Sequence, residues 1–499
     1  MRTNGILQLS PLFRVVVAMV LGMVTSAEWT GGVSPFSWFS FMLASVVVAL
    51  ALRRHALLQG LAIMVAVFFC GACLMSVKRD EGKVVFSGEE EIYGAVLLSE
   101  PVQRGKVVQF DMLLTTGHMA RQRVRASLLR DTVDRNYQRL HVGDGIVAQS
   151  VMEPYAYRGT FSATTFIFWS NWRKSVIDLT GLSFFERTRL AALVFRQKLL
   201  QRVGTLGLDN DDFSVAVAMA LGERRFISRE LRDAYSVSGA SHILALSGLH
   251  LGLIYMFLSL LLARRRFRLL GECLTLTAIW AYVLMVGMPP SVVRAAIMLT
   301  IYGVLGLAHR DRMSLNALSL AAIIMLVANP QLVYDVGFQL SFLSVAAIVL
   351  LYRPFSQLLP RRISCLPVVG WIWGMLVVSF CAQLGTIPLV MYYFGRVPCY
   401  GLLTNFVVIP LAYVILLLVL VFLAMSWWPL ACSWLAKGLA FAVSLQNKVL
   451  WSIASLPGSS IDGISISRFQ VVLLYVAIVC FSAVVVLFSN SLAKKRGVL

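Results

Sequence analysis

Polar side chains interrupt an apolar stretch that is long enough to cross a bilayer. The stretch runs from Gly239 as Gly-Ala-Ser-His-Ile-Leu-Ala-Leu-Ser-Gly-Leu-His-Leu-Gly-Leu-Ile and contains His242, Ser247 and His250. A charge at the centre of a membrane helix costs about 2.5–3.5 kcal/mol on insertion scales, so such groups persist where they face a protein interior or water. On one continuous helix, Ser247 and His250 lie one turn apart, and His242 lies two turns before His250. The pattern predicts a polar face beside a hydrated path.

Ser247 and His250 are also the residue types of a serine nucleophile and its general base. The stretch offers no third group to orient the histidine, and Ser-Gly-Leu-His is not a nucleophile elbow. A hydrolase is therefore a weaker interpretation than a polar path. An interpretation without chemistry also stays open, in which both histidines are core residues with satisfied hydrogen bonds.

The rest of the sequence lacks the clusters that hold metals, cofactors or nucleotides. None of the six histidines belongs to a His-x-His-x-Asp-His or His-Glu-x-x-His motif, and no Gly-x-x-x-x-Gly-Lys-Ser/Thr loop is present. The eight cysteines are scattered, mostly in apolar runs, which argues against a disulfide framework. We therefore expect no metal, no cofactor and no enzymatic activity in this chain.

The composition is that of a protein with many membrane spans. Of 499 residues, 59% are hydrophobic and 14% are charged, and the formal net charge is +20. Cytoplasmic loops rich in Lys and Arg account for part of this charge. The remainder suits an anionic substrate or anionic lipid.

Apolar runs of spanning length recur along the chain and predict about twelve spanning or half-spanning helices. Three of them precede residue 78, and the others lie within residues 236–490. The runs cover residues 12–29, 36–52, 56–76, 240–263, 269–287, 291–308, 313–328, 337–352, 369–393, 402–425, 428–447 and 470–489.

Basic clusters predict the orientation of these spans. Arg53 and Arg54 follow the second run, and four further clusters fall on the same side of the membrane when the runs alternate. Because Lys and Arg concentrate in cytoplasmic loops, we expect both termini in the cytoplasm, including a basic tail at 491–499. The four clusters are Arg264, Arg265, Arg266 and Arg268, then Arg310 and Arg312, then Arg353, Arg361 and Arg362, then Lys494, Lys495 and Arg496.

Residues 78–160, after the third apolar run, have a different residue pattern. Short β-patterned segments alternate with Gly and polar turns, which predicts a small extracytoplasmic β-barrel of the OB type. Arg121, Arg123 and Arg125 alternate, so one strand would place all three on one face, either for an anionic ligand or as a solvated face without one. The predicted strands cover residues 84–86, 92–98, 107–114 and 146–148.

The expected fold class is a predominantly α, polytopic membrane protein with this barrel inserted after the third span. Basic residues among Leu and Val in 184–203 predict a helix lying at the membrane interface. The expected domains are spanning helices in 1–77, the barrel in 78–160, interfacial helices in 161–235, the main membrane domain in 236–490 and the tail in 491–499.

Four blocks occur in a fixed order within residues 220–410. They are Ala-Leu-Gly-Glu-Arg from Ala220 with the segment that ends at His250, Pro-Ser-Val-Val-Arg-Ala-Ala-Ile-Met from Pro290, Ser-Leu-Asn-Ala-Leu from Ser314 leading to Asp-Val-Gly-Phe-Gln-Leu-Ser-Phe from Asp335, and Gln-Leu-Gly-Thr-Ile-Pro from Gln383 leading to Asn405. These blocks resemble the core signature of the ComEC family of competence proteins. The segment around Gly143-Asp144-Gly145 resembles, more weakly, that family's OB-like domain.

The resemblance implies an inner-membrane channel for single-stranded DNA in natural transformation, served by a periplasmic DNA receptor and a cytoplasmic translocation motor. Longer members carry a metallo-β-lactamase-like domain proposed to degrade the other strand, and these 499 residues contain no such domain. We therefore expect strand degradation to belong to a separate nuclease. Phe161-Ser162-Ala163 also replaces the family's usual Phe-Asp-Tyr after the outer domain.

The resemblance and the apolar surroundings together predict the residues of the DNA path. Neutral polar groups would hold a polyanion weakly enough for release at each step, and Arg294 is expected to meet phosphate near the outer mouth. The path candidates are His242, Ser247, His250, Arg294, Asp335, Gln339, Ser341, Gln383 and Asn405, and Arg121, Arg123 and Arg125 are candidates for DNA contact on the outer domain.

Other interpretations stay open for several of these residues. Arg294 can pair with Asp335, and Asp335 can cap the helix that follows it. Gln339 and Gln383 can bond neighbouring helices away from any substrate. For the whole chain, the alternative is a secondary transporter of an anionic small molecule or lipid, which predicts internal repeats that the sequence does not clearly show.

Overall fold

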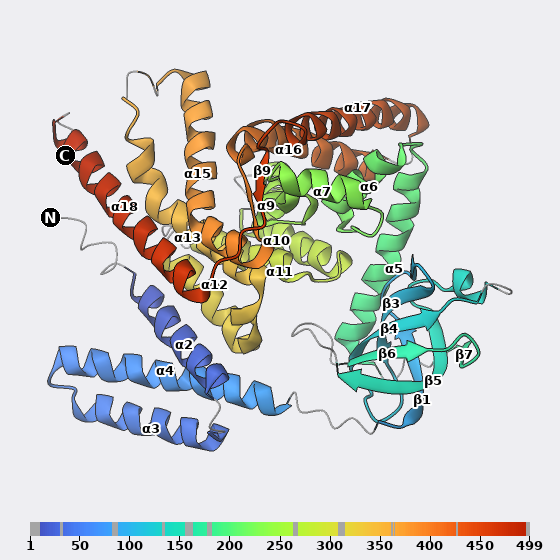
Figure 1. Ribbon diagram of the computed structural model, residues 1–499, viewed down its shortest axis with the longest axis horizontal. Helices are drawn as coiled ribbons and strands as arrows, with labels where there is room; N and C mark the ends of the chain where they lie inside the picture. Colours follow the sequence, from blue (N-terminus) through green and yellow to red (C-terminus); the bar gives the residue numbers. More distant parts are fainter. Residues whose placement is uncertain are drawn as a thin grey trace.

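The computed structural model describes residues 10–29, 33–81, 88–131, 135–154, 163–176, 182–262, 268–307, 315–360, 363, 365–425 and 428–495. Figure 1 shows three parts in chain order, namely three N-terminal helices, a small β-barrel and a larger helical bundle. Helix α5 (Phe184–Gly204) runs from the barrel into the bundle.

The N-terminal helices are α2 (Pro11–Glu28), α3 (Pro35–Ala51) and α4 (Ala56–Glu81). Glycines allow α2 and α4 to cross closely, because a Cβ on Gly71 would collide with the carbonyl of Met19. Met19 then packs with Met325 in one apolar cluster, which attaches this group to the main bundle.

The barrel is a closed ring of five strands, in which β1 pairs with β3, β3 with β4, β4 with β6, β6 with β5, and β5 with β1. Only the β4–β6 pair is parallel. A five-stranded Greek-key barrel is the OB architecture, so the OB-like prediction is confirmed. The strands are β1 (Glu90–Leu97), β2 (Val102–Arg104), β3 (Val107–Leu114), β4 (Arg123–Leu129), β5 (Gly145–Pro154), β6 (Ala163–Ile167) and β7 (Trp172–Lys174), with the short helix η1 (Asn136–Arg139) before β5.

Two details of the barrel differ from the sequence prediction. The sheet continues through β6 and β7 to Lys174, beyond the expected boundary at residue 160. Arg121 lies before β4 with a backbone φ of 67°, and its N–H donates to the carbonyl of Leu114. Only Arg123 and Arg125 therefore share an outward strand face. The predicted strand at 84–86 lies outside the described residues.

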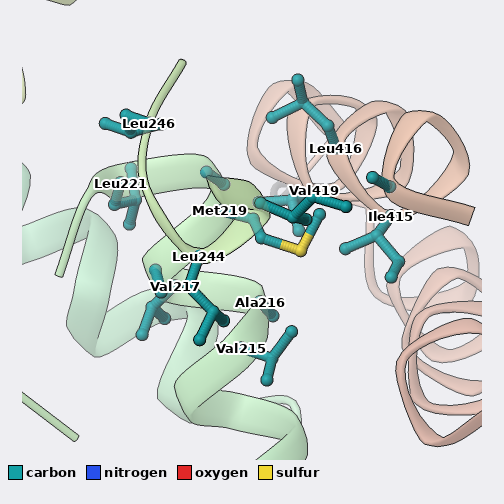
Figure 2. Packing of buried hydrophobic residues seen from close by; sticks show 14 of the residues in the cluster. Val215, Ala216, Val217, Met219, Leu221, Leu244, Leu246, Ile415, Leu416 and Val419 are labelled. Carbon is teal, nitrogen blue, oxygen red and sulfur yellow. The ribbon is translucent and has the colours of Figure 1, made fainter. Parts of the chain in front are cut away.

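The segment after the barrel forms α5, α6 (Asn210–Leu221) and α7 (Arg229–Val237). Helix α6 is packed inside the protein, since every residue from Ser214 to Leu221 is buried, whereas a position of this segment at the membrane interface stays a prediction. Figure 2 shows the reason: Met219 of α6 lies against Val419 of α16 (Gly401–Met425) inside the largest apolar cluster.

The N-terminal helices and the main bundle together confirm a multi-pass membrane protein. Eight helices of the described chain are long and apolar enough to span a membrane, and α3, α9 and α12 are shorter apolar helices. The run at 428–447 is a helix, α17, that is not among the eight. The remaining elements are α8 (Ser241–Leu244), α9 (Gly248–Leu262), α10 (Arg268–Met285), α11 (Pro290–Leu307), α12 (Leu315–Ala328), η4 (Pro330–Tyr334), α13 (Val336–Ser356), α15 (Pro367–Phe394), β8 (Arg396–Pro398), α17 (Pro429–Ala454), β9 (Ser460–Asp462) and α18 (Arg468–Lys495).

The orientation of these helices stays a prediction. Most of the basic residues that predicted it lie outside the described residues, namely Arg264, Arg265, Arg266, Arg310, Arg312, Arg361, Arg362 and Arg496.

Helices α13 and α15 pack closely against each other. A Cβ on Gly385 would lie 2.6 Å from the carbonyl oxygen of Leu343 and 2.9 Å from Cβ of Ala347. Three residues later Pro388 removes one backbone donor from α15, and Tyr475 of α18 donates to the carbonyl of Gly385 at 3.0 Å. The carbonyl that loses its helical donor is that of Leu384, four residues before Pro388, and the bond from Tyr475 thus lies one residue from this interruption.

Candidate nucleic-acid path

The apolar stretch at 240–263 is not one helix. Helix α8 ends at Leu244, Ala245 is extended, and α9 begins at Gly248. Ser291 at the start of α11 donates to the carbonyl of Leu246 at 2.8 Å, so the interruption is bonded by a neighbouring helix. The helical spacing predicted from His242 to His250 is therefore wrong, whereas the turn from Ser247 to His250 is helical.

Ser247 and His250 together cap the start of α9. The backbone N–H of Ser247 donates to Nδ1 of His250 at 3.2 Å, and the Ser247 hydroxyl lies 2.9 Å from the same nitrogen. This is the contact that Glu or Gln makes in a capping box, with imidazole in its place. Because Nδ1 accepts from a backbone donor, the ring is neutral and its hydrogen is on Nε2. His250 therefore carries no positive charge in this arrangement.

His250 leaves one polar atom unused inside the protein. Its side chain is 2% exposed, and Nε2 has no hydrogen-bond partner among the described residues. His242 is exposed instead, and its Nδ1 donates to the carbonyl of Gly239 at 3.2 Å. The two histidines thus differ in environment, although they come from one sequence block.

Arg294 is buried with few partners. The side chain is 3% exposed, and neither Nε nor one terminal nitrogen bonds to any described group. Its ion pair with Asp335 is long, at 3.9 Å, because the same carboxylate oxygen accepts from the backbone N–H of Phe338 at 2.6 Å. Asp335 is therefore the N-cap of α13, as the simpler interpretation predicted, and only a distant counter-ion for Arg294.

The next polar residues lie in the first turns of α13. Gln339 donates to the carbonyl of Val333 at 2.7 Å and accepts from the Tyr393 hydroxyl at 3.0 Å, so it joins α13 to η4 and α15. Ser341 is half-buried. From Gln339 to Leu351 every side chain is half-buried, with none fully packed and none fully exposed.

Gln383 of α15 lies beside the start of α16, the helix that carries Asn405. A Cβ on Gly401 would lie 3.2 Å from the Gln383 amide nitrogen, and Asn405 follows Gly401 by about one turn. Asn405 is 9% exposed, and its Oδ1 has no bonding partner in the described part of the chain. A Cβ on Gly239, just before α8, would also touch Gly401, so His242 belongs to the same neighbourhood.

The structure gathers most of the predicted residues at one end of the bundle. The first two turns of α9, α11, α13 and α16 hold five path candidates, and Ser247 and Asp335 lie directly before α9 and α13. The five are His250, Arg294, Gln339, Ser341 and Asn405. Three contacts join these helix starts, namely Ser291 with Leu246, Arg294 with Asp335, and Gly239 with Gly401. We call this set the polar mouth: Ser247, His250, Arg294, Asp335, Gln339, Ser341 and Asn405.

Polar pairs deeper in the bundle were missed by the sequence interpretation. Tyr255 of α9 donates to Glu272 of α10 at 2.6 Å, and Gly303 of α11 leaves the room that this carboxylate occupies. The Trp280 indole donates to Thr300 at 3.1 Å. The sequence did contain a signal for Glu272, because it is the one acidic residue in the apolar run at 269–287.

Two hollows on the described residues lie away from the polar mouth. One, of about 370 Å³, lies between α3 and α4 and is apolar. The other, of about 510 Å³, lies between α6 and α17 and is lined by Asp209, Asp211, Asp212 and Lys448 among others. Burial raises the pKa of Asp212 above its usual value, although Asn447 donates to its carboxylate at 2.8 Å.

The arginines on the barrel are engaged within the protein. Arg125 forms an ion pair with Asp111 at 3.1 Å. Burial lowers the pKa of Arg123, and the nearby carboxylates of Glu186 on α5 and Asp111 partly offset this effect. This face of the barrel therefore lies near α5, and it is not an open basic surface.

A second missed group is a buried ionic cluster behind the mouth. Glu223, from the Ala-Leu-Gly-Glu-Arg block, is 4% exposed and lies between Arg196 and Arg225. Burial lowers the pKa of Arg196, and the Glu223 carboxylate acts in the opposite direction. The sequence marked Glu223 as part of a block but gave it no role.

Comparison with known proteins adds family information to this geometry. ComE operon protein 3 of Bacillus subtilis is 29% identical over 245 residues, which cover 48% of this chain and 30% of that protein. Recombination protein 2 of Haemophilus influenzae is 27% identical over 296 residues, covering 57% of this chain and 35% of that protein. Each match thus spans well under half of the relative. No solved structure matches the chain.

The family assignment rests on a longer match. A family model described as Competence protein matches residues 219–488, which include α7 to α17 and every residue of the polar mouth. This segment is more than half of the 499 residues. The chain therefore belongs to the competence protein family.

Proposed function

We propose that this protein conducts single-stranded DNA across the bacterial inner membrane during natural transformation. Family membership supports a role in DNA uptake, and the multi-pass bundle supports a location in the membrane. In this proposal both termini are cytoplasmic and the barrel is extracytoplasmic. A periplasmic DNA receptor, a cytoplasmic motor and a separate nuclease would supply capture, force and strand degradation.

The observation that carries the proposal is the state of Arg294. A buried guanidinium normally has its donors bonded, because an unpaired buried polar group is costly. Arg294 is 3% exposed and leaves two nitrogens without partners in the described structure, with Asp335 only at 3.9 Å. A phosphate oxygen would satisfy these donors, since guanidinium and phosphate match in charge and geometry.

The other groups of the mouth suit passage of a strand more than tight binding. His250 is neutral, and Gln339, Ser341 and Asn405 carry no charge, so Arg294 supplies the positive charge within the polar mouth. Conduction requires sites that are weak enough to release what they bind. The side chains of α13 from Gln339 to Leu351 are half-buried, so this helix keeps exposed surface beside its contact with α15 along which a strand can pass.

Substitution of Arg294 in a transformable host tests the proposal. We expect Arg294→Gln to reduce import of labelled single strands at least tenfold while protein abundance in the membrane stays near normal, and Arg294→Lys to retain part of the import. Arg229→Ala, which removes an exposed arginine on α7, is the matched control and should import normally. Normal DNA import by Arg294→Gln at normal abundance would contradict the proposal. A variant that imports DNA normally but loses transport of phosphate ions would favour a small-anion transporter instead.

A further inference from the structure

Glu223 joins two arginines that reach in opposite directions. Its Oε2 lies 3.4 Å from Arg196 of α5, and its Oε1 lies 3.0 Å from Nε of Arg225. The backbone N–H of Arg225 also donates to Oε1 at 3.3 Å. We call Glu223, Arg196 and Arg225 the Glu223 junction.

One arm of the junction holds the turn between α10 and α11. Arg196 donates to the carbonyl of Val286 at 3.4 Å, and Arg189, two turns earlier on α5, donates to the carbonyl of Gly287 at 2.9 Å. Gly287 and Met288 both have positive φ, so this turn has a demanding backbone conformation. The turn leads directly into α11, whose second turn carries Arg294.

The other arm reaches the barrel. Arg225 donates to the backbone carbonyl of Glu100, in the connection between β1 and β2. The Glu100 carboxylate lies 3.6 Å from Nδ1 of His141 in the loop before β5. That loop also packs on α5, because a Cβ on Gly143 would lie 3.1 Å from Val194.

We propose that Glu223 is a positioning residue that fixes the α10–α11 turn, and with it Arg294, relative to the barrel. A buried ion pair adds little net stability compared with apolar packing of the same volume, but it fixes directions. The junction consists of one carboxylate between two guanidinium groups, and each guanidinium also bonds a carbonyl of a different segment. Movement of the barrel loop would therefore be transmitted to the turn below the mouth. The importance of this link for DNA rests on the proposed function, whereas the link itself does not.

Hydrogen exchange of the full chain in lipid nanodiscs tests the link without any DNA. Glu223→Gln removes the charge while keeping the shape of the side chain. We expect amide exchange to rise at least threefold both at 284–290 and in the barrel loops 98–101 and 140–144, while strand 107–114 keeps its protection. Glu230→Gln on the exposed side of α7 is the control and should change neither segment.

Several results would overturn the inference. A rise confined to one of the two segments would show that Glu223 acts only locally, and a rise that includes strand 107–114 would show general destabilisation. If the Glu223→Gln protein does not accumulate, the same measurement is made on Arg225→Ala. This substitution removes the contact with the barrel and leaves Arg196 beside Glu223. Unchanged amide exchange at 284–290 in Arg225→Ala would refute the link. A confirmed link with normal DNA import in the same variants would count against the proposed function alone.

Discussion

The backbone N–H of Ser247 and Nδ1 of His250 form a hydrogen bond of 3.2 Å across the first turn of α9. This contact assigns the His250 ring to a neutral tautomer with its hydrogen on the buried Nε2. The residues with the strongest chemical signal in the sequence thus build the start of a helix at the polar mouth, and Arg294 on the neighbouring α11 supplies the charge.

Substitutions at His250 separate its capping role from any need for imidazole. Gln at this position restores the usual acceptor of a capping box, so we expect the free energy of unfolding of His250→Gln to lie within about 0.5 kcal/mol of the wild-type value. His250→Leu has no acceptor, and its free energy of unfolding should fall by about 1 kcal/mol. Thermal unfolding in detergent measures both. DNA import should follow the same order, and import abolished in a fully stable His250→Gln protein would show that the ring itself is required.

The contact between α13 and α15 predicts opposite effects for two glycines of one helix. A Cβ at Gly385 would lie 2.6 Å from a backbone oxygen, so Gly385→Ala should destabilise the protein by about 1–3 kcal/mol. At Gly374 the nearest atom is the Tyr352 hydroxyl at 3.6 Å, so Gly374→Ala should be neutral or should stabilise by up to about 1 kcal/mol. Thermal unfolding compares the two variants, and equal effects would refute the close helix contact.

The raised pKa of Asp212 predicts a pH-dependent change in stability. Burial favours the protonated acid in the folded protein, so this residue destabilises the fold at neutral pH, and the penalty disappears as the pH falls through the raised value towards the usual 3.8. Asp212→Asn keeps an acceptor for Asn447 and removes the charge. We expect its melting temperature to exceed that of the wild type at pH 7.5, with a smaller difference at pH 5.

The control for that experiment is Asp211→Asn, which changes an exposed neighbour. A difference between Asp212→Asn and the wild type that stays constant with pH would contradict the assignment of the effect to the half-buried Asp212 carboxylate.

Sequence patterns predicted the elements well where hydrophobic periodicity dominates. Strand β3 spans Val107–Leu114 as expected, and the barrel closes in the OB order. The prediction of one continuous helix over 240–263 was wrong because apolar composition alone does not show a helix break. The break here depends on the cap at Ser247 and on the hydrogen bond from Ser291. Periodicity reports which face is buried, whereas a break depends on partners from other helices.

The approach of one pair of candidate residues was predictable, whereas the wider arrangement was not. Arg294 and Asp335 were paired from the sequence, and they do approach each other, although the cap at Phe338 keeps the pair long. Glu223 could not be assigned, because its partner Arg196 comes from another helix and the role of Arg225 depends on the barrel. Such contacts depend on tertiary packing that no local pattern encodes.

Water access to Ser341 tests the central claim most directly. In a variant with the native cysteines replaced by serine, Ser341→Cys is treated with a membrane-impermeant thiol reagent, with and without a single strand arrested in transit. Val476→Cys on α18 is the control, since this side chain is 53% exposed on an apolar helix and should meet lipid. The account predicts that position 341 reacts, that the strand protects it, and that position 476 does not react. A cysteine at 341 that stays unreactive, or that reacts equally with the strand in place, would contradict the account.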